Sequence, residues 1–401
     1  MKIHYLNSRW ILIALMAMPV KGMADAEDSL NFVAGAGIRF EDNLFRLSDS
    51  VDTDTLPGKP HKSDLLYSAN AGIKIDKPYS QQRFQLDLLA TGNKFQHNSF
   101  LDFTGFDYRA AWLWHLTPRI SGILLANQEQ RLVNFADFRE FDENNIQTNQ
   151  VRLFNVDADI GAGMHLIGGV MEVRSRNSRT FTAVGDYVQR GGEFGVKYLA
   201  PSNSHVSLVQ RRLQGEYRDR ELDSLAQLDT GFDQNETEAK LNWKLTGKST
   251  IDARLGYVDR DHDNFPERDY SGMVGKLEYQ WAATGKLQLN TSLSRNLFSF
   301  QEDANSYYIA ETFSFGPIWK VTAKSTLRAR YDISDRDYRG AIVLASSLRQ
   351  DTVQSFIIFG DWQATRNILV SGTLQHDRRS SNVENFDYDA NAVGISAQLL
   401  F

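Results

Sequence analysis

The sequence predicts an all-β chain, and three observations support this prediction. Apolar and polar residues alternate along most of the chain, as they do in strands that have two different faces. Short and long polar connections follow one another in turn. The mean hydropathy is only −0.41. Transmembrane β-strands are compatible with such a value, because the polar residues that alternate with the lipid-facing ones lower the average. We therefore expect a transmembrane antiparallel up-and-down β-barrel of about 18 strands, with about 16 as the alternative count.

The first residues have the layout of a secretory signal peptide. After a positively charged start, an apolar run occupies 10–20, and small residues surround Ala24 and Ala26. The run is shorter than the ~20 residues that a spanning helix needs. We expect cleavage after Ala24 or Ala26, so that 1–24 is the signal peptide and 27–401 is a single outer-membrane barrel.

Composition excludes several kinds of chemistry. The chain has no cysteine, so thiol catalysis and cysteine metal ligands are excluded. It carries no HExxH or GxSxG motif, and its carboxylates are scattered through loops, so we expect neither an enzyme nor a cofactor or metal site. The formal charge is −6, and it falls to −9 without the three basic residues of 1–24, which argues against nucleic acid as a partner.

The expected strands follow in order along the chain. Each has an apolar residue at every second position, and the clearest of these apolar faces begin at Leu30, Leu65, Phe84, Tyr108, Phe154, Ala239, Ile251 and Ile368. The short connections between strands are expected at 77–82, 116–119, 167–169, 200–204, 246–249, 282–286, 322–325 and 364–367. Neighbouring strands that close in order leave no edge, so every backbone polar group in the bilayer is paired.

Tryptophan placement supports the membrane prediction. Each tryptophan that follows the signal segment lies a few residues before a short connection; the six are Trp112, Trp114, Trp243, Trp281, Trp319 and Trp362. Strands that run down to a periplasmic turn bring these side chains to one membrane interface, where amphipathic rings are favoured. We expect them to form an aromatic belt.

The last residues, NAVGISAQLLF, alternate up to a terminal aromatic residue. One apolar face is formed by Val393, Ile395, Ala397, Leu399 and Phe401. We expect this strand to pair with the first one, because an unpaired edge is an aggregation hazard. The pattern also resembles the signal by which the outer-membrane barrel assembly machinery recognises its clients.

The face away from lipid is expected to line an aqueous lumen. By alternation, the lumen-lining candidates are Asp87, Asn155, Asp157, Asp159, Lys240, Lys244, Asp252, Arg254, Lys276, Glu278, Arg328 and Arg330. Such residues either bind hydrated solutes or only solvate the wall, and alternation does not separate these two roles. An arginine-rich segment adds a candidate constriction, formed by Arg211, Arg212, Arg218 and Arg220.

Several stretches are more specific than a generic barrel pattern. They are FEDNLFRLSD at 40–49, SQQRFQLDL at 80–88, WLWHLTPRISG at 112–122, and the NFADFRE and ENNIQT stretches that follow. Together they resemble the EpsL-like outer-membrane β-barrels of exosortase-associated exopolysaccharide loci, within a wider group of β-barrel porins. The resemblance implies a location in the outer membrane of a Gram-negative bacterium and a part in exopolysaccharide biosynthesis or export. It supplies no catalytic motif and assigns no functional residue.

Three functional hypotheses stay open at this point. The first is a porin-like channel with a polar lumen for hydrated carbohydrate, which takes part in exopolysaccharide biosynthesis and polysaccharide transport. The second is a general or small-solute diffusion porin, and the third is a plugged structural or docking barrel of a polysaccharide secretion complex. The expected partners are outer-membrane lipid, the barrel assembly machinery, exopolysaccharide or oligosaccharide, and periplasmic export partners.

Overall fold

The computed structural model describes residues 29–138, 141–179, 185–301, 305–340 and 348–401. In this part of the chain it has eighteen strands: β1 (Leu30–Glu41), β2 (Asp64–Tyr79), β3 (Gln82–Phe95), β4 (Phe103–Thr117), β5 (Ile120–Leu132), β6 (Ile146–Gly161), β7 (Met164–Asn177), β8 (Asp186–Leu199), β9 (His205–Arg218), β10 (Gly231–Thr246), β11 (Ser249–His262), β12 (Tyr270–Trp281), β13 (Leu287–Ser299), β14 (Tyr307–Lys320), β15 (Ser325–Arg339), β16 (Gln350–Gln363), β17 (Ile368–Ser381) and β18 (Tyr388–Leu400). Three short 3₁₀ helices lie in the described loops: η2 (Thr53–Thr55), η3 (Ser99–Leu101) and η4 (Pro266–Arg268). No helix in these residues is long and apolar enough to cross a membrane.

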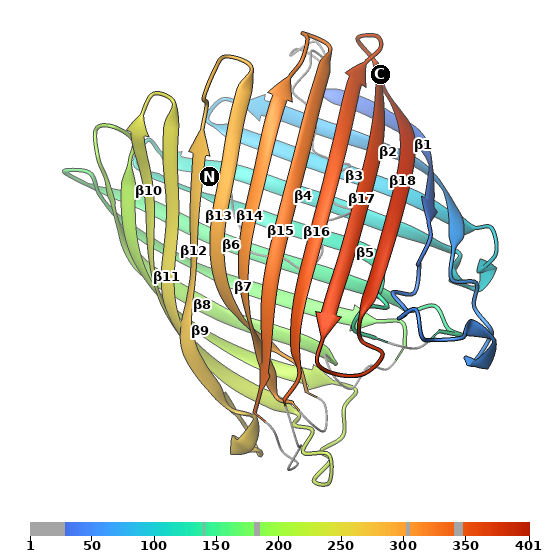
Figure 1. Ribbon diagram of the computed structural model, residues 1–401. Coiled ribbons are helices and arrows are strands. Elements are labelled where there is room, and N and C mark those ends of the chain that lie inside the picture. Colours follow the sequence, from blue (N-terminus) through green and yellow to red (C-terminus); the bar gives the residue numbers. More distant parts are fainter. Residues whose placement is uncertain (1–28, 139–140, 180–184, 302–304, 341–347) are drawn as a thin grey trace.

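The strands form one closed antiparallel barrel. Each strand pairs with its neighbours in sequence, and β1 pairs with both β2 and β18. Short turns gather at the rim where the chain ends, and the longer loops lie at the other end (Figure 1). Closure satisfies the backbone hydrogen bonds that lipid cannot satisfy, which is why a barrel with this outer surface is stable in a bilayer. The predicted fold class and strand count are therefore confirmed.

The alternation in the sequence becomes an outer and an inner face. Apolar side chains such as Phe32, Phe84, Phe154 and Leu255 are exposed on the outer face, although they are large. Their neighbours in sequence point the other way, into the barrel, since successive side chains of a strand lie on opposite faces. An outer surface of exposed apolar side chains around a polar interior identifies the lipid-facing side.

One predicted connection is wrong. The sequence predicts a turn at 167–169, but Ile167 and Gly169 pair with Asp157 and Asn155 inside the β6–β7 ladder. The turn lies at 162–163 instead, where Ala162 and Gly163 have φ values of 54° and 75°. Two successive positive φ values give the tight turn whose twist matches antiparallel strands. The connection expected at 77–82 is also shorter, because β2 and β3 extend through both of its ends.

The proposed signal peptide, 1–24, and its cleavage sites at Ala24 and Ala26 lie outside the described residues. The description begins at Ser29, directly before β1, so neither the cleavage nor the start of the mature barrel at residue 27 is tested. Both assignments therefore stay predictions.

Candidate functional site: a loop constriction inside the barrel

Three of the longer loops, at the end of the barrel opposite the short turns (Figure 1), share a buried apolar cluster. Phe45 and Leu47 come from the loop at 42–63, Leu101 from η3, and Phe135 and Phe141 from the loop at 133–145. The ring of Phe45 lies 4.7 Å from that of Phe135 and 5.9 Å from that of Phe141, and both Phe45 and Leu101 are completely buried. Burial of these side chains stabilises the loops against one another. The FEDNLFRLSD and NFADFRE stretches therefore meet in space, although about 90 residues separate them in sequence.

The first loop turns inward at Asn43, which is almost completely buried. Its side-chain amide donates to the carbonyl oxygens of Leu47 and Asp389, both at 2.8 Å, and its side-chain oxygen accepts from the backbone N–H of Leu47 at 2.9 Å. The Asn43 side chain thus forms hydrogen bonds with backbone groups that are not paired in a strand at this turn. Its bond to Asp389 also connects the loop to β18.

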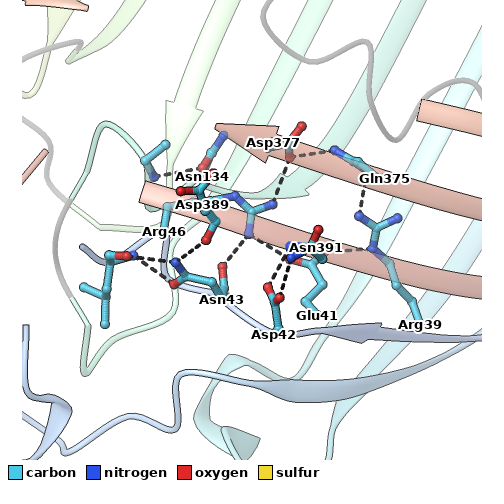
Figure 2. Close-up of polar contacts among 12 residues, drawn as sticks. Arg39, Glu41, Asp42, Asn43, Arg46, Asn134, Gln375, Asp377, Asp389 and Asn391 are labelled. Carbon is cyan, nitrogen blue, oxygen red and sulfur yellow. Dashed lines mark hydrogen bonds and ion pairs between the residues drawn. The ribbon is translucent and has the colours of Figure 1, made fainter. Parts of the chain in front are cut away.

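Arg46 connects this loop to the opposite side of the β1–β18 seam. Figure 2 shows its guanidinium between Glu41 on β1 and Asp377 on β17, and the Arg46–Glu41 distance is 3.0 Å. Arg39 donates to Glu41 at 2.7 Å and to Gln375 at 2.8 Å, so the network continues across the inner wall. Burial by itself lowers the pKa of Arg46, but the nearby Glu41 and Asp377 carboxylates raise it above its ordinary value. Arg46 therefore stays charged.

The third loop is held by Asp137, which faces three arginines of the barrel wall. Its carboxylate lies 2.8 Å from Arg379 on β17, 3.6 Å from Arg336 on β15 and 3.8 Å from Arg349 beside β16. Arg379 also donates to the carbonyl oxygen of Ala136 at 2.7 Å. The loop begins after β5, and β5 is separated from β17 by several strands of the barrel, so these contacts carry the loop over part of the lumen. The lumen is narrowed there.

The arginines of this anchor are themselves fixed. Arg349 donates three hydrogen bonds to Asp351, the shortest of 2.6 Å. Its guanidinium lies 4.0 Å from the ring centre of Phe386 and 4.4 Å from that of Tyr338. Arg379 is 2% exposed and Asp351 is also 2% exposed. Buried charges of opposite sign with several hydrogen bonds each form a rigid group rather than a mobile surface.

We call this assembly the constriction: Arg39, Glu41, Arg46, Asp137, Arg336, Arg349, Asp351, Asp377 and Arg379. Sequence reasoning did not select any of these residues as site residues. The alternation of the strands places Arg39, Asp377 and Arg379 on the inner face, so these three could have been predicted to line the lumen. Nothing local in the sequence indicates that Asp137 reaches the wall of β15–β17, because that contact joins residues about 240 positions apart.

All twelve lumen-lining candidates lie on the inner face of their strands: Asp87, Asn155, Asp157, Asp159, Lys240, Lys244, Asp252, Arg254, Lys276, Glu278, Arg328 and Arg330. Many of them are paired with a neighbour. Lys276 contacts Glu278 at 2.8 Å, and Arg328 contacts Asp361 at 2.6 Å. Asp157 accepts from His165 at 2.6 Å and also pairs with Lys197. The wall is thus polar and hydrogen-bonding, with charges of both signs close together.

The four arginines that the sequence suggested as a constriction do not lie together: three are on β9, on both of its faces, and Arg220 follows the strand. Arg211 faces inward and pairs with Glu193 at 2.8 Å and with Glu236, and Arg220 donates to Gln301 at 2.6 Å. Arg212 and Arg218 are exposed on the outer face of β9. The division arises because β9 continues to Arg218 instead of ending in a loop, so its side chains keep alternating.

The six tryptophans lie on the outer face, close to the rim of short turns: Trp112, Trp114, Trp243, Trp281, Trp319 and Trp362. The C-terminal residues Val393, Ile395, Ala397, Leu399 and Phe401 share the outer face of the last strand. The ring of Phe401 stacks on that of Phe32 at 5.8 Å, beside the β1–β18 ladder. Recognition of this segment by the assembly machinery stays a prediction.

No group of three histidine, aspartate or glutamate side chains among the described residues is arranged to hold a metal ion. The described residues of the interior present hydrogen-bond donors and acceptors, many of them in ion pairs, along the wall and at the constriction. This arrangement suits passage or binding of a hydrated solute.

Comparison with known proteins places this architecture in a class. Residues 213–401, just under half of the chain, match the family model described as "Putative beta-barrel porin 2". No curated protein matches the chain. Fold, outer surface and family match together define a porin-like barrel of the outer membrane of a Gram-negative bacterium.

Solved structures of similar fold include barrels from two Pseudomonas species. OccK1 (OpdK) of Pseudomonas aeruginosa is 12% identical, with a TM-score of 0.51 over 94% of this chain and 99% of that one. OccK9 (OpdG) of the same organism and a BenF-like porin from Pseudomonas fluorescens Pf-5 are each 14% identical, with TM-scores of 0.50 over 94% of this chain and 99% of theirs. At these identities the likeness shows a shared fold.

Proposed function

We propose that this barrel is an outer-membrane channel for hydrated carbohydrate and that it takes part in exopolysaccharide biosynthesis or export. The observation that carries the proposal is the constriction, where loop residues Arg46 and Asp137 bring charged groups into the path along the lumen. Carboxylates, guanidinium groups and amides there can replace the water around sugar hydroxyls. Because the loops narrow the path, an extended single saccharide chain fits the proposal better than a bundled polymer.

The resemblance of the FEDNLFRLSD, NFADFRE and ENNIQT stretches to exopolysaccharide-associated barrels supports the cellular role. In the structure these stretches belong to the loops that form or surround the constriction. The chemistry of the proposed path and the resemblance thus depend on the same part of the molecule. The narrowing of the lumen by the loops also keeps the docking barrel as a second candidate.

A small-solute diffusion porin is the other alternative. It is favoured by the narrowing itself, and one of the barrels of similar fold, OpdK of Pseudomonas aeruginosa, has a crystal structure with vanillate, a small aromatic acid (TM-score 0.50). A channel of this kind needs no polymer and no export partner.

Single-channel conductance of the refolded protein in a planar bilayer tests the proposal, before and after addition of purified exopolysaccharide fragments. Open current that these fragments block, while unrelated neutral oligosaccharides do not, is the expected result. Open current without selective block favours the small-solute porin. Absence of current contradicts a channel and favours the docking barrel. Deletion of the gene with loss of secreted polymer, while uptake of small solutes is unchanged, tests the cellular role separately.

A further inference from the structure

A group of charged residues lies on the lipid-facing side of the barrel, where apolar residues are expected. Arg152 on β6, Glu172 and Arg174 on β7, and Arg190 on β8 share the outer face with Phe154, Val170 and Phe194 of the same strands. We call these four charged residues the outer arginine cluster. It is separate from the constriction, whose side chains point into the barrel.

The cluster has more positive than negative charge. Glu172 contacts Arg190 at 2.7 Å, Arg152 at 3.3 Å and Arg174 at 3.6 Å, so one carboxylate faces three guanidinium groups. On the flanking strands, the residues opposite Arg152 and Arg190 are Ala126 and Gln214, which carry no charge. The side chains of Arg152 and Arg190 are each 55% exposed, which leaves their remaining N–H groups accessible to an anion.

The height of the cluster matches the outer boundary of the bilayer. Glu172 and Arg190 each lie eight positions from the Met164–Tyr198 pair, which is at the rim of short turns. With about 3.3 Å per residue and a tilt of about 40°, this corresponds to roughly 20 Å along the membrane normal. The apolar band of such barrels is about 25 Å tall. The cluster therefore lies just below the outer edge of that band, from where long arginine side chains can extend to the headgroups of the outer leaflet.

Between the cluster and the rim of short turns, the outer surface is apolar, and two glycines leave backbone exposed there. Val170 and Phe194 are 60% and 62% exposed. Gly168 and Gly192 lie beside them in the ladder, and a side-chain carbon added to either would meet only a backbone oxygen, at 3.5 Å and 3.4 Å. An acyl chain can lie against these strands where side chains are missing. Cationic groups above an apolar surface match a lipid with an anionic headgroup.

We propose that the outer arginine cluster binds the phosphate group of an outer-leaflet phosphoglycolipid of the lipid A type, with an acyl chain against Val170 and Phe194. Guanidinium groups bind phosphate through paired hydrogen bonds. Three of them, from adjacent strands, converge on the Glu172 carboxylate, and the exposed Arg152 and Arg190 have further N–H groups for a phosphate beside it. Glu172 orients Arg152 and Arg190 towards each other and leaves two positive charges for the ligand. The site fixes one orientation of the barrel wall against the outer leaflet.

Binding of purified bisphosphorylated lipid A to the full barrel in detergent, measured by native mass spectrometry, tests this proposal. The variant replaces Arg152, Arg174 and Arg190 with glutamine. The matched control is Arg295→Gln, because Arg295 is also an outer-face arginine eight positions from its end of β13 but pairs with Glu311 on β14. We expect affinity to fall about tenfold or more in the triple variant and to change little in the control.

Three further outcomes decide the matter. Equal binding of lipid A by the triple variant overturns the proposal, and so does equal binding of a dephosphorylated lipid A by the original protein, since the apolar surface then suffices. Displacement of lipid A by inorganic phosphate at matched ionic strength contradicts a lipid site and indicates a simple anion site. If the triple variant fails to give a heat-resistant folded band on gels, Arg190→Gln alone is measured, with the same expected direction.

Discussion

Neutralising Asp137 is expected to release the third loop from the barrel wall. Asp137→Asn keeps the size of the side chain and one oxygen for Arg379, but it removes the charge that faces three arginines at 2.8, 3.6 and 3.8 Å. In an effective dielectric of about 20, these separations correspond to Coulomb energies of about 6, 5 and 4 kcal/mol before desolvation is subtracted. Measured losses on removing one partner of a buried ion pair are smaller, about 3–5 kcal/mol.

The lower end of that range applies, because asparagine retains a hydrogen-bond acceptor. A loss of about 3 kcal/mol shifts the equilibrium between the docked and the released loop by about 100-fold. Strand pairing does not involve Asp137, so the barrel itself is expected to stay folded. The expected effect is then a lumen that is wider, or that changes in width as the loop docks and is released.

Single-channel recording measures this effect. We expect Asp137→Asn to show larger open currents, or frequent steps to a higher level, with an unchanged heat-resistant band on gels. Glu129→Gln is the control, since Glu129 is an inner-face carboxylate of β5 that pairs with Arg131 on its own strand at 3.3 Å and holds no loop. Identical traces for Asp137→Asn and the original protein refute the assigned role of the third loop, and an equal change in Glu129→Gln shows that lumen charge alone is responsible.

Three other perturbations follow from the structure. Asn43→Ala removes the hydrogen bonds to Leu47 and leaves buried backbone groups unpaired, so the first loop should lose about 1–3 kcal/mol and exchange its amide hydrogens faster. Gly122→Ala places a Cβ against a carbonyl oxygen of β6 and should lower the refolding yield, whereas Gly360→Ala meets nothing within 4 Å and should not. Burial alone raises the pKa of Asp229, but hydrogen bonds from the neighbouring loop lower it below 3.8, so its contribution to loop stability is present above that pH and is lost as the pH falls through the lowered value. Proteolysis of the loop that holds Asp229 should therefore accelerate only below pH 3.8, and acceleration that is complete above that pH would contradict this role.

The sequence indicated the membrane face well because that signal is local. Residues such as Phe154 and Asp157 reveal their faces through the alternation of their own strand, and the tryptophans reveal the rim through their distance from the short turns. The same rule failed at 167–169, where two glycines suggested a turn. They lie inside β7, because the positive φ values of Ala162 and Gly163 had already reversed the chain.

What the sequence by itself determined is the barrel: its alternating strands, its strand number, its rim of tryptophans and its polar interior. These features repeat every two residues or every hairpin, so each can be read from a short window of sequence. Only the tertiary structure decided where the loops fold and which charges meet. Asp137 and Arg379 are 242 positions apart, and Arg46 and Asp377 are 331 apart. No periodic pattern encodes such contacts, since they depend on closure of the barrel and on the burial of Phe45 and Phe135 against each other.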